Sequence, residues 1–260
     1  MGAADAATAT AVDKEYVMGL EKGLLLIEAF GASNSPLTLS EAADITGHSK
    51  ASTRRALLTL VKLGYARASG RHFFLEPRTL RLVHAYVNST PLTKVAQPIL
   101  EITSERTRES ASLAVLDSHF VVFVARSTQR RSLSFGLGIG ARLPAYCSAT
   151  GRVLLAGMPD EEVEFRLQRM SRQAITPKTK TDVSALMNEV QAARECGYSI
   201  SDEELEIGLR SIAVPVRNRK GELLGAMSLS VATSRMSRDD VVNKLMPELE
   251  VARRTFALQL

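Results

Sequence analysis

One stretch, residues 38–63, constrains the fold of this 260-residue chain more than any other part, because its pattern predicts two short helices joined by a tight turn. The first helix is expected over residues 40–46. Gly47 follows it and can adopt the positive φ that such a turn needs, since it has no Cβ. Ser49 is a favourable N-cap for the second helix, which is expected to open at Ser49 or Lys50. The stretch therefore predicts a helix-turn-helix.

The second helix of this pair has two different faces when it is wound at 3.6 residues per turn. One face is expected to pack inward, and it consists of Thr53, Ala56, Leu57, Leu60 and Val61. The opposite face is small, polar and basic, and it consists of Ala51, Ser52, Arg55, Thr59 and Lys62, with Lys50 and Arg54 on its flanks. Such a face suits a helix that enters the major groove of DNA. For this segment alone, the alternative is an ordinary amphipathic surface helix with solvated charges.

The segments around this pair predict a winged form of the motif. Residues 20–30 have the pattern of a third, amphipathic helix. Residues 65–68 and 72–75 have the pattern of two short strands around a turn at Ser69 and Gly70. Arg67 and Arg71 lie in this hairpin, where they could meet the phosphate backbone of DNA. A plain structural ribbon is the alternative for the hairpin.

The charge of the chain is concentrated in the same region. Between Lys50 and Arg81 there are eight cations and one acid, so this window carries +7 in a chain whose net charge is +5. A basic region of this kind is the electrostatic footprint of a protein that binds a polyanion.

The remaining composition predicts a soluble cytoplasmic protein. Residues 1–15 contain no apolar core of signal-peptide length and are expected to form a disordered tail. No apolar run approaches the roughly 20 residues that span a bilayer, so no membrane partner is expected. Cys147 and Cys196 are the only cysteines and are expected to be reduced.

The last two-thirds of the chain predict an α+β domain. Strand patterns occur at residues 112–116, 120–125, 133–138, 212–216 and 223–231. Helix patterns occur at residues 92–108, with a break near Pro98, and at residues 148–158, 182–196 and 239–258, with a further helical start after Pro159. Helices before, between and after antiparallel strands are typical of an antiparallel sheet with helices on one face and a small-molecule pocket on the other.

The sequence predicts no catalytic or metal site and no cofactor. The four histidines are scattered, with three in the first third of the chain. Cys147 has no evident partner base and is expected to be a small buried thiol. The glycines of residues 136–140 are not followed by a helix start, which disfavours a nucleotide loop. The acids of residues 202–206 are expected to begin a helix or to be solvated, because consecutive strand residues alternate faces and cannot all meet one ion.

Two segments, LEKGLLLIEAF and LTLSEAADITGHSKASTRRALLTLVKLGYA, resemble the DNA-binding domain of IclR-type bacterial transcription regulators, and most of all the branch that governs aromatic-acid catabolism. The resemblance runs from about Tyr16 onward. It implies a winged helix-turn-helix domain at residues 16–76, a linker helix at 77–90 and a GAF-like effector-binding domain with an antiparallel sheet at 91–260. Residues 52–55 match the part of the recognition helix that meets DNA. The expected DNA-binding residues are Ser49, Lys50, Ser52, Thr53, Arg54, Arg55, Thr59, Arg67 and Arg71.

The resemblance also implies a pocket for a small carboxylate effector. Residues 202–216 match the segment that lines this pocket in the family, although Ser201 and Ser211 stand where some members carry Asp and Cys. The hydroxyls of such a pocket can bind a carboxylate, and the start of the helix at Ala149 would add backbone N–H donors. The expected effector-binding residues are Phe135, Ala149, Thr150, Ser201, Leu209, Ser211, Ser228 and Ser230.

Together these features predict a transcription regulator that binds a palindromic double-stranded DNA operator as a homodimer or a dimer of dimers, under the control of a small organic acid. Two other classes remain open. The second domain could be an enzyme that converts a metabolite, or the winged domain could bind RNA.

Overall fold

The computed structural model describes residues 15–33, 35–128 and 138–260. The expected tail and the expected strand at residues 133–138 fall almost wholly outside these ranges, and Phe135 falls outside them entirely. The chain divides into two compact units, Met1–Ala85 and Tyr86–Leu260. The expected boundary after residue 90 lies a few residues beyond this division, at the junction of two helices.

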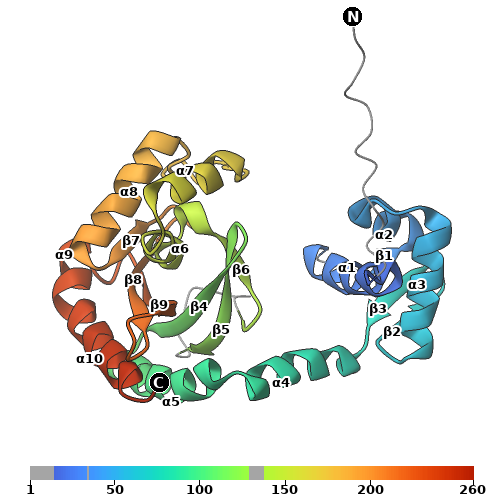
Figure 1. Ribbon diagram of the computed structural model, residues 1–260, viewed down its shortest axis with the longest axis horizontal. Coiled ribbons are helices and arrows are strands. Elements are labelled where there is room, and N and C mark those ends of the chain that lie inside the picture. The colour runs from blue at the N-terminus through green and yellow to red at the C-terminus, as the bar shows by residue number, and fades with distance from the viewer. Residues whose placement is uncertain (1–14, 34, 129–137) are drawn as a thin grey trace, which may run out of the picture. The chain divides into compact units, whose positions relative to one another are not determined.

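The first unit is a winged helix-turn-helix (Figure 1). Its helices are α1 (Met18–Ala32), α2 (Leu39–Thr46) and α3 (Lys50–Lys62), and its strands are β1 (Leu37–Thr38), β2 (Ala66–Ser69) and β3 (His72–Leu75). The strands form an antiparallel sheet in the order β1-β3-β2. Leu26, Leu57 and Leu60 are buried where α1 packs on α3. The predicted helices and wing are confirmed, and β1 adds a third strand that the sequence did not indicate.

Local signals explain where α2 begins and ends. The Thr38 hydroxyl accepts a hydrogen bond from the Glu41 N–H, while the Glu41 carboxylate accepts one from the Thr38 N–H at 2.7 Å. This capping box satisfies two backbone donors at the start of the helix. Gly47 ends it at φ +68°, which confirms the predicted turn.

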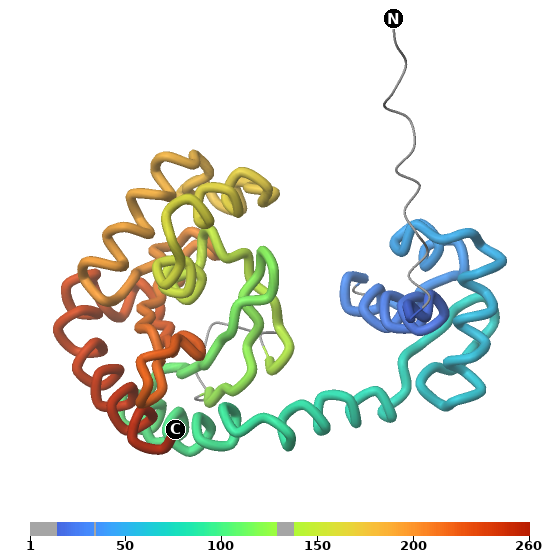
Figure 2. The backbone as a smooth tube through the Cα atoms, viewed as in Figure 1, coloured from blue at the N-terminus to red at the C-terminus, as the bar shows by residue number. Residues whose placement is uncertain are grey.

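The second unit is built on a six-stranded antiparallel sheet in the order β6-β5-β4-β9-β8-β7 (Figures 1 and 2). Its strands are β4 (Ser110–Asp117), β5 (Phe120–Ser127), β6 (Arg142–Pro144), β7 (Ser199–Asp202), β8 (Leu209–Arg217) and β9 (Leu223–Ala232). Strands β6 and β7 were not predicted. Both are short edge strands, and an edge strand needs less apolar pattern than a central one.

Helices cover both faces of this sheet, which corrects the expectation of one covered face. One face packs on α5 (Pro91–Thr107) and on α10 (Met246–Ala257). The other face packs on α6 (Ala149–Leu155), α7 (Asp160–Arg169) and α8 (Val183–Cys196). The central strands are therefore apolar on both sides over much of their length.

Three expected helices differ in detail. Helix α5 is continuous through Pro98, although a break was expected, because the buried side chains of Ala96, Ile99 and Leu100 pack it on the sheet on both sides of the proline. The expected helix at 239–258 contains a π-helical turn at Val241–Leu245 between α9 (Arg238–Asp240) and α10. The helix after Pro77 begins with a 3₁₀ turn at Pro77–Thr79, continues as α4 (Leu80–Ser89) and buries no side chain.

Candidate functional site

Helix α3 presents a basic outer face. Ser49 caps it by accepting a hydrogen bond from the Ser52 N–H, which confirms the predicted N-cap. The side chains of Lys50, Arg54 and Arg55 are exposed and have no hydrogen-bond or ion-pair partner within the described part of the chain. Of the other expected DNA-binding residues on the helix, Ser49 and Thr59 are exposed and Ser52 is half-buried.

Thr53 does not belong to this face, and its assignment to a DNA contact is wrong. Its side chain is 1% exposed and lies on the inner side of α3. Its hydroxyl donates to the Ser49 carbonyl at 3.1 Å, so the donor is already used inside the helix. Thr53 can therefore position α3 but cannot touch a nucleic acid directly.

The wing places its two arginines differently. Arg71 is exposed at the turn between β2 and β3 and has no ion-pair partner among the described residues. Arg67 lies 3.9 Å from the centroid of the Phe74 ring and pairs with Glu76 at 3.0 Å, while more than half of its side chain remains exposed. Arg71 is thus free to bind phosphate, whereas Arg67 has two partners within the hairpin.

An apolar groove of about 610 Å³ lies in the first unit between α1 and α3. Leu20, Leu24 and Leu63 line it and are each about half exposed. Arg55 and Thr59 also line the groove, so the basic face of α3 and this apolar surface share an edge.

The second unit contains a cavity of about 320 Å³ between the sheet and α6. Its volume is at the lower end of the range of small-molecule sites. The cavity brings together six of the eight expected effector residues, namely Ala149, Thr150, Leu209, Ser211, Ser228 and Ser230. Ser201 does not line it, because its hydroxyl is buried and donates to the Cys147 carbonyl at 2.8 Å. Phe135 lies outside the described residues.

The cavity floor follows from strand register. Ser211 of β8 lies opposite Ser230 of β9, and their hydroxyls form a hydrogen bond of 2.8 Å. Ser228 lies two residues away from Ser230 on β9 and therefore on the same face. Four strands in all place serines on this face in two neighbouring cross-strand rows, and the seven are Ser110, Ser112, Ser199, Ser201, Ser211, Ser228 and Ser230.

Sequence reasoning missed several residues of the cavity. Phe123, Leu143, Ile175 and Leu205 provide apolar wall, and Arg126 of β5 is the cationic side chain among the described lining residues. Arg126 could have been found from the register of the strands. It lies opposite Ser112, and Ser112 lies opposite Ser228, so the three side chains share one face of the sheet.

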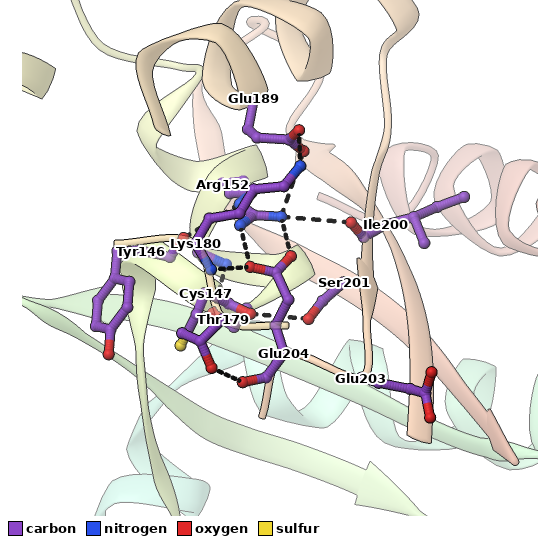
Figure 3. A network of polar contacts seen from close by, with 12 residues as sticks. Tyr146, Cys147, Arg152, Thr179, Lys180, Glu189, Ile200, Ser201, Glu203 and Glu204 are labelled. Atoms are coloured by element: carbon purple, nitrogen blue, oxygen red, sulfur yellow. Dashed lines mark hydrogen bonds and ion pairs between the residues drawn. The ribbon is translucent and has the colours of Figure 1, made fainter. Parts of the chain in front are cut away.

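A buried ion pair fixes the segment that forms one wall of the cavity (Figure 3). Arg152 of α6 is fully buried and donates two hydrogen bonds, of 2.6 and 2.7 Å, to the carboxylate of Glu204. Its guanidinium also donates to the Tyr146 carbonyl at 3.1 Å. Glu204 is 4% exposed, so the expectation that the acids of residues 202–206 are all solvated or begin a helix is wrong.

The thiol of Cys147 is fully buried, which confirms the structural interpretation. Burial raises the pKa of this thiol to about 12, so it remains protonated and is a poor nucleophile at neutral pH. In the described ranges no group of three His, Cys, Asp or Glu side chains is arranged to hold a metal ion. Over the same residues, no helix is both long enough and apolar enough to span a membrane.

Comparisons with known proteins agree with both units. Residues 19–70 match the IclR helix-turn-helix domain, and residues 84–256 match the bacterial transcriptional regulator IclR C-terminal domain. The chain is 39% identical over 249 residues to the Pca regulon regulatory protein of Pseudomonas putida, a match that covers 95% of this chain and 86% of the relative. It is 37% identical over 242 residues to the p-hydroxybenzoate hydroxylase transcriptional activator of Acinetobacter baylyi, with 91% and 89% covered.

Among solved structures, an IclR homologue from Microbacterium hydrocarbonoxydans in complex with 4-hydroxybenzoate superposes with a TM-score of 0.76. It is 25% identical to this chain, and the match covers 93% of this chain and 98% of that one. The family matches cover both units, and two relatives above 30% identity cover nearly the whole chain. The chain therefore belongs to the IclR family of bacterial transcription regulators.

Proposed function

We propose that the protein binds a palindromic operator through α3 and the wing, and that a small aromatic carboxylate in the cavity of the second unit controls this binding. The observation that carries the proposal is the cavity itself, in which apolar side chains surround a floor of serine hydroxyls. Such a lining suits a ring with polar substituents. One relative is an activator named for p-hydroxybenzoate hydroxylase, and one solved homologue is in complex with 4-hydroxybenzoate, which supports the same ligand class.

A thermal-shift panel of aromatic and short aliphatic acids tests the ligand class. A ligand that binds only the folded protein stabilises it by mass action, by about 2.7 kcal/mol at a concentration 100 times its dissociation constant. We expect hydroxylated benzoates to raise the melting temperature and short aliphatic acids to have little effect. A panel in which no aromatic acid raises it would overturn the ligand assignment.

Replacing Ser211 with valine is expected to weaken effector binding about tenfold. The change removes one hydroxyl from the cavity floor and leaves that of Ser230 without its partner, and a hydrogen bond of this kind contributes about 0.5–1.5 kcal/mol. DNA affinity without effector should stay close to that of the wild type. Titration calorimetry and an operator-binding assay measure the two quantities.

Thr103→Val is the matched control for this substitution. Thr103 is buried and Ser211 is half-buried, but Thr103 lies on α5 at the opposite face of the sheet, where its hydroxyl donates to the Ile99 carbonyl. Its loss should leave effector affinity unchanged. If Ser211→Val and Thr103→Val respond alike, Ser211 is not part of the effector site.

Replacing Arg55 with alanine is expected to weaken operator binding by about 1–3 kcal/mol, the usual contribution of an arginine that reads a base edge. The side chain is exposed on the outer face of α3 and has no partner in the described protein that would hold it away from DNA. The measurement is a titration of the operator duplex at fixed salt concentration, because the affinity depends strongly on salt.

Arg238→Ala controls for the lost charge. Arg238 is exposed in the second unit and has no ion-pair partner there among the described residues. This variant should bind the operator like the wild type. An Arg55→Ala variant that loses no more affinity than Arg238→Ala would remove Arg55 from the DNA interface.

We also propose that the protein acts as a homodimer or a dimer of dimers. The half-exposed leucines of the groove between α1 and α3 form an apolar surface that a second copy could cover. A dimer would present two copies of α3 to two half-sites about one helical turn apart. A protection footprint with a single half-site would contradict this arrangement.

The control of DNA binding is proposed to follow from linkage. The effector changes operator occupancy only if it binds two arrangements of the dimer with different affinity. We propose that the second unit binds its ligand without converting it, because Ser211 pairs with another serine and not with a base that could activate it. Since its partner is bacterial DNA, the proposed location is the cytoplasm.

A further inference from the structure

Arg126 occupies an unusual position in the cavity. It lines the wall on β5, in the same cross-strand row as Ser112 and Ser228. Its guanidinium carbon lies 5.4 Å from the centroid of the Phe123 ring, a second lining residue. Cation–π contact with this ring holds the guanidinium beside the cavity.

The guanidinium of Arg126 contains a buried N–H donor that has no hydrogen-bond acceptor among the described residues. Its Nε is buried without a hydrogen bond, and no ion pair to the side chain exists among the described residues. A buried donor without a hydrogen-bond acceptor lowers the stability of the folded protein by about 1–3 kcal/mol, and by more when the donor is charged. In native proteins an unpartnered buried polar group is explained by strain, by a functional role, or by a bound water, ion or ligand.

Two of the other arginines that lie over aromatic rings have an acidic partner, which Arg126 lacks, and the remaining two in the described residues are exposed to solvent. Arg67 and Arg142 each lie over a phenylalanine ring, and each also pairs with an acid, Glu76 and Asp117 respectively. The charged side chain that shares the cavity wall with Arg126 is Glu206, which is exposed to solvent. Burial lowers the pKa of Arg126, but an arginine stays cationic at neutral pH. The cavity thus contains a positive charge that forms no ion pair with the described residues and could bind an anionic ligand.

We propose that Arg126 is the residue that binds the carboxylate of the effector, an inference that rests on the proposed function. A guanidinium can donate two parallel hydrogen bonds to a carboxylate, which fixes the plane of the bound acid as well as its charge. The acid then enters with its carboxylate towards β5. Arg126, which was not among the effector-binding residues expected from the sequence, would therefore recognise the negative charge of the effector.

The opposite side of the floor then selects the other substituent of the ring. Strands β5 and β8 are separated by β4 and β9, which is three strand spacings of about 4.8 Å each. An arginine side chain and a benzene ring together can bridge such a span. The paired hydroxyls of Ser211 and Ser230 keep one donor and several lone pairs for a further bond. The ligand class is therefore an aromatic acid with a hydrogen-bonding group, such as a hydroxyl, on the side of the ring away from the carboxylate.

Titration calorimetry on the full chain tests this assignment with matched pairs of ligands. The probes are 4-hydroxybenzoate and protocatechuate, each compared with its neutral amide. The variants are Arg126→Gln, which removes the charge, and Arg126→Lys, which keeps the charge but loses the planar pair of donors. Arg142→Gln is the control. Arg142 lies on the neighbouring strand β6 and packs over the ring of Phe120, but it does not line the cavity.

The wild type is expected to prefer each acid over its amide. Arg126→Gln should lower the affinity for the acid about tenfold to hundredfold, or about 1.4–2.8 kcal/mol, and should change amide binding less than threefold. The affinity of Arg126→Lys for the acid should lie between those of the wild type and Arg126→Gln. The affinity of Arg142→Gln should equal that of the wild type. Retained amide binding also shows that the cavity of Arg126→Gln is intact.

Two different failures can be told apart. If the wild type binds a probe acid and Arg126→Gln keeps the same ratio of acid to amide affinity, the role of Arg126 is wrong while the proposed function stands. Equal loss of acid and amide binding would likewise reduce Arg126 to a structural residue. If the wild type binds neither probe nor any other aromatic acid, the proposed function fails and takes this assignment with it.

Discussion

Replacing Arg152 with methionine is expected to lower the free energy of unfolding of the second unit by about 3–5 kcal/mol, because it leaves the carboxylate of Glu204 buried without its countercharge. Arg152 is fully buried, and its two short hydrogen bonds to Glu204 satisfy both carboxylate oxygens. In the variant, the Lys180 N–H at 3.1 Å remains as a donor to this carboxylate. One amide cannot replace a guanidinium.

The loss should spread from this pair to the cavity. Arg152 belongs to α6, and Glu204 belongs to the segment between β7 and β8 that also contributes Leu205 and Glu206 to the cavity wall (Figure 3). The backbone carbonyl of Glu204 accepts a hydrogen bond from the Thr179 hydroxyl at 2.6 Å, which ties the same segment to the loop before α8. Weaker effector binding should therefore accompany the lower stability.

Urea denaturation followed by far-ultraviolet circular dichroism measures this effect. Arg166→Met is the control, since Arg166 forms an exposed pair with Glu162 on α7 whose loss should cost less than about 1 kcal/mol. The double variant Arg152→Met with Glu204→Leu removes both charges and should recover part of the loss. A cost for Arg152→Met no greater than that for Arg166→Met would show that the buried pair does not stabilise the unit.

The sequence predicted the first unit well because its determinants are local. The capping serine, the glycine turn and the apolar stripe of α3 all act within a few residues of one another, and each appears in the structure as expected. Thr53 is the instructive error. Its place on the helical wheel indicated the inner face, while the family resemblance assigned it to DNA, and the buried side chain agrees with the wheel.

The second unit was predicted less completely because its site depends on contacts between distant segments. Arg152 and Glu204 are 52 positions apart, and no local pattern marks either as a partner of the other. Arg126 reaches the cavity through the register of β5 on β4 and of β4 on β9, which a single sequence does not reveal. Six of the expected effector residues do line the cavity, but the resemblance to a family indicated them, and strand patterns alone did not.

Gly151→Ala is expected to destabilise the second unit by about 3 kcal/mol, at the upper end of the usual cost of overpacking, and to abolish high-affinity effector binding. A Cβ at Gly151 would overlap the carbonyl oxygen and Cα of Ala145 and would lie 2.6 Å from its carbonyl carbon. These are backbone atoms of the buried turn before α6, so they cannot move aside as the end of a side chain can. The helix that carries Thr150 and Arg152 would have to shift instead.

Gly157→Ala is a matched control for this substitution, because its Cβ would also meet a close neighbour, but the nearest atom is a terminal methyl group of Leu223, and the nearest backbone atom, the Leu154 carbonyl oxygen, is 3.3 Å away. A leucine side chain can change rotamer, so this variant should cost about 1 kcal/mol or less and should bind effector normally. Thermal unfolding and effector titration of both variants separate the two cases. If Gly151→Ala behaves like Gly157→Ala in both measurements, the close approach of α6 to Ala145 does not set the shape of the cavity. If only Gly151→Ala loses effector binding, the absence of a side chain at this position is what allows α6 to form the cavity wall.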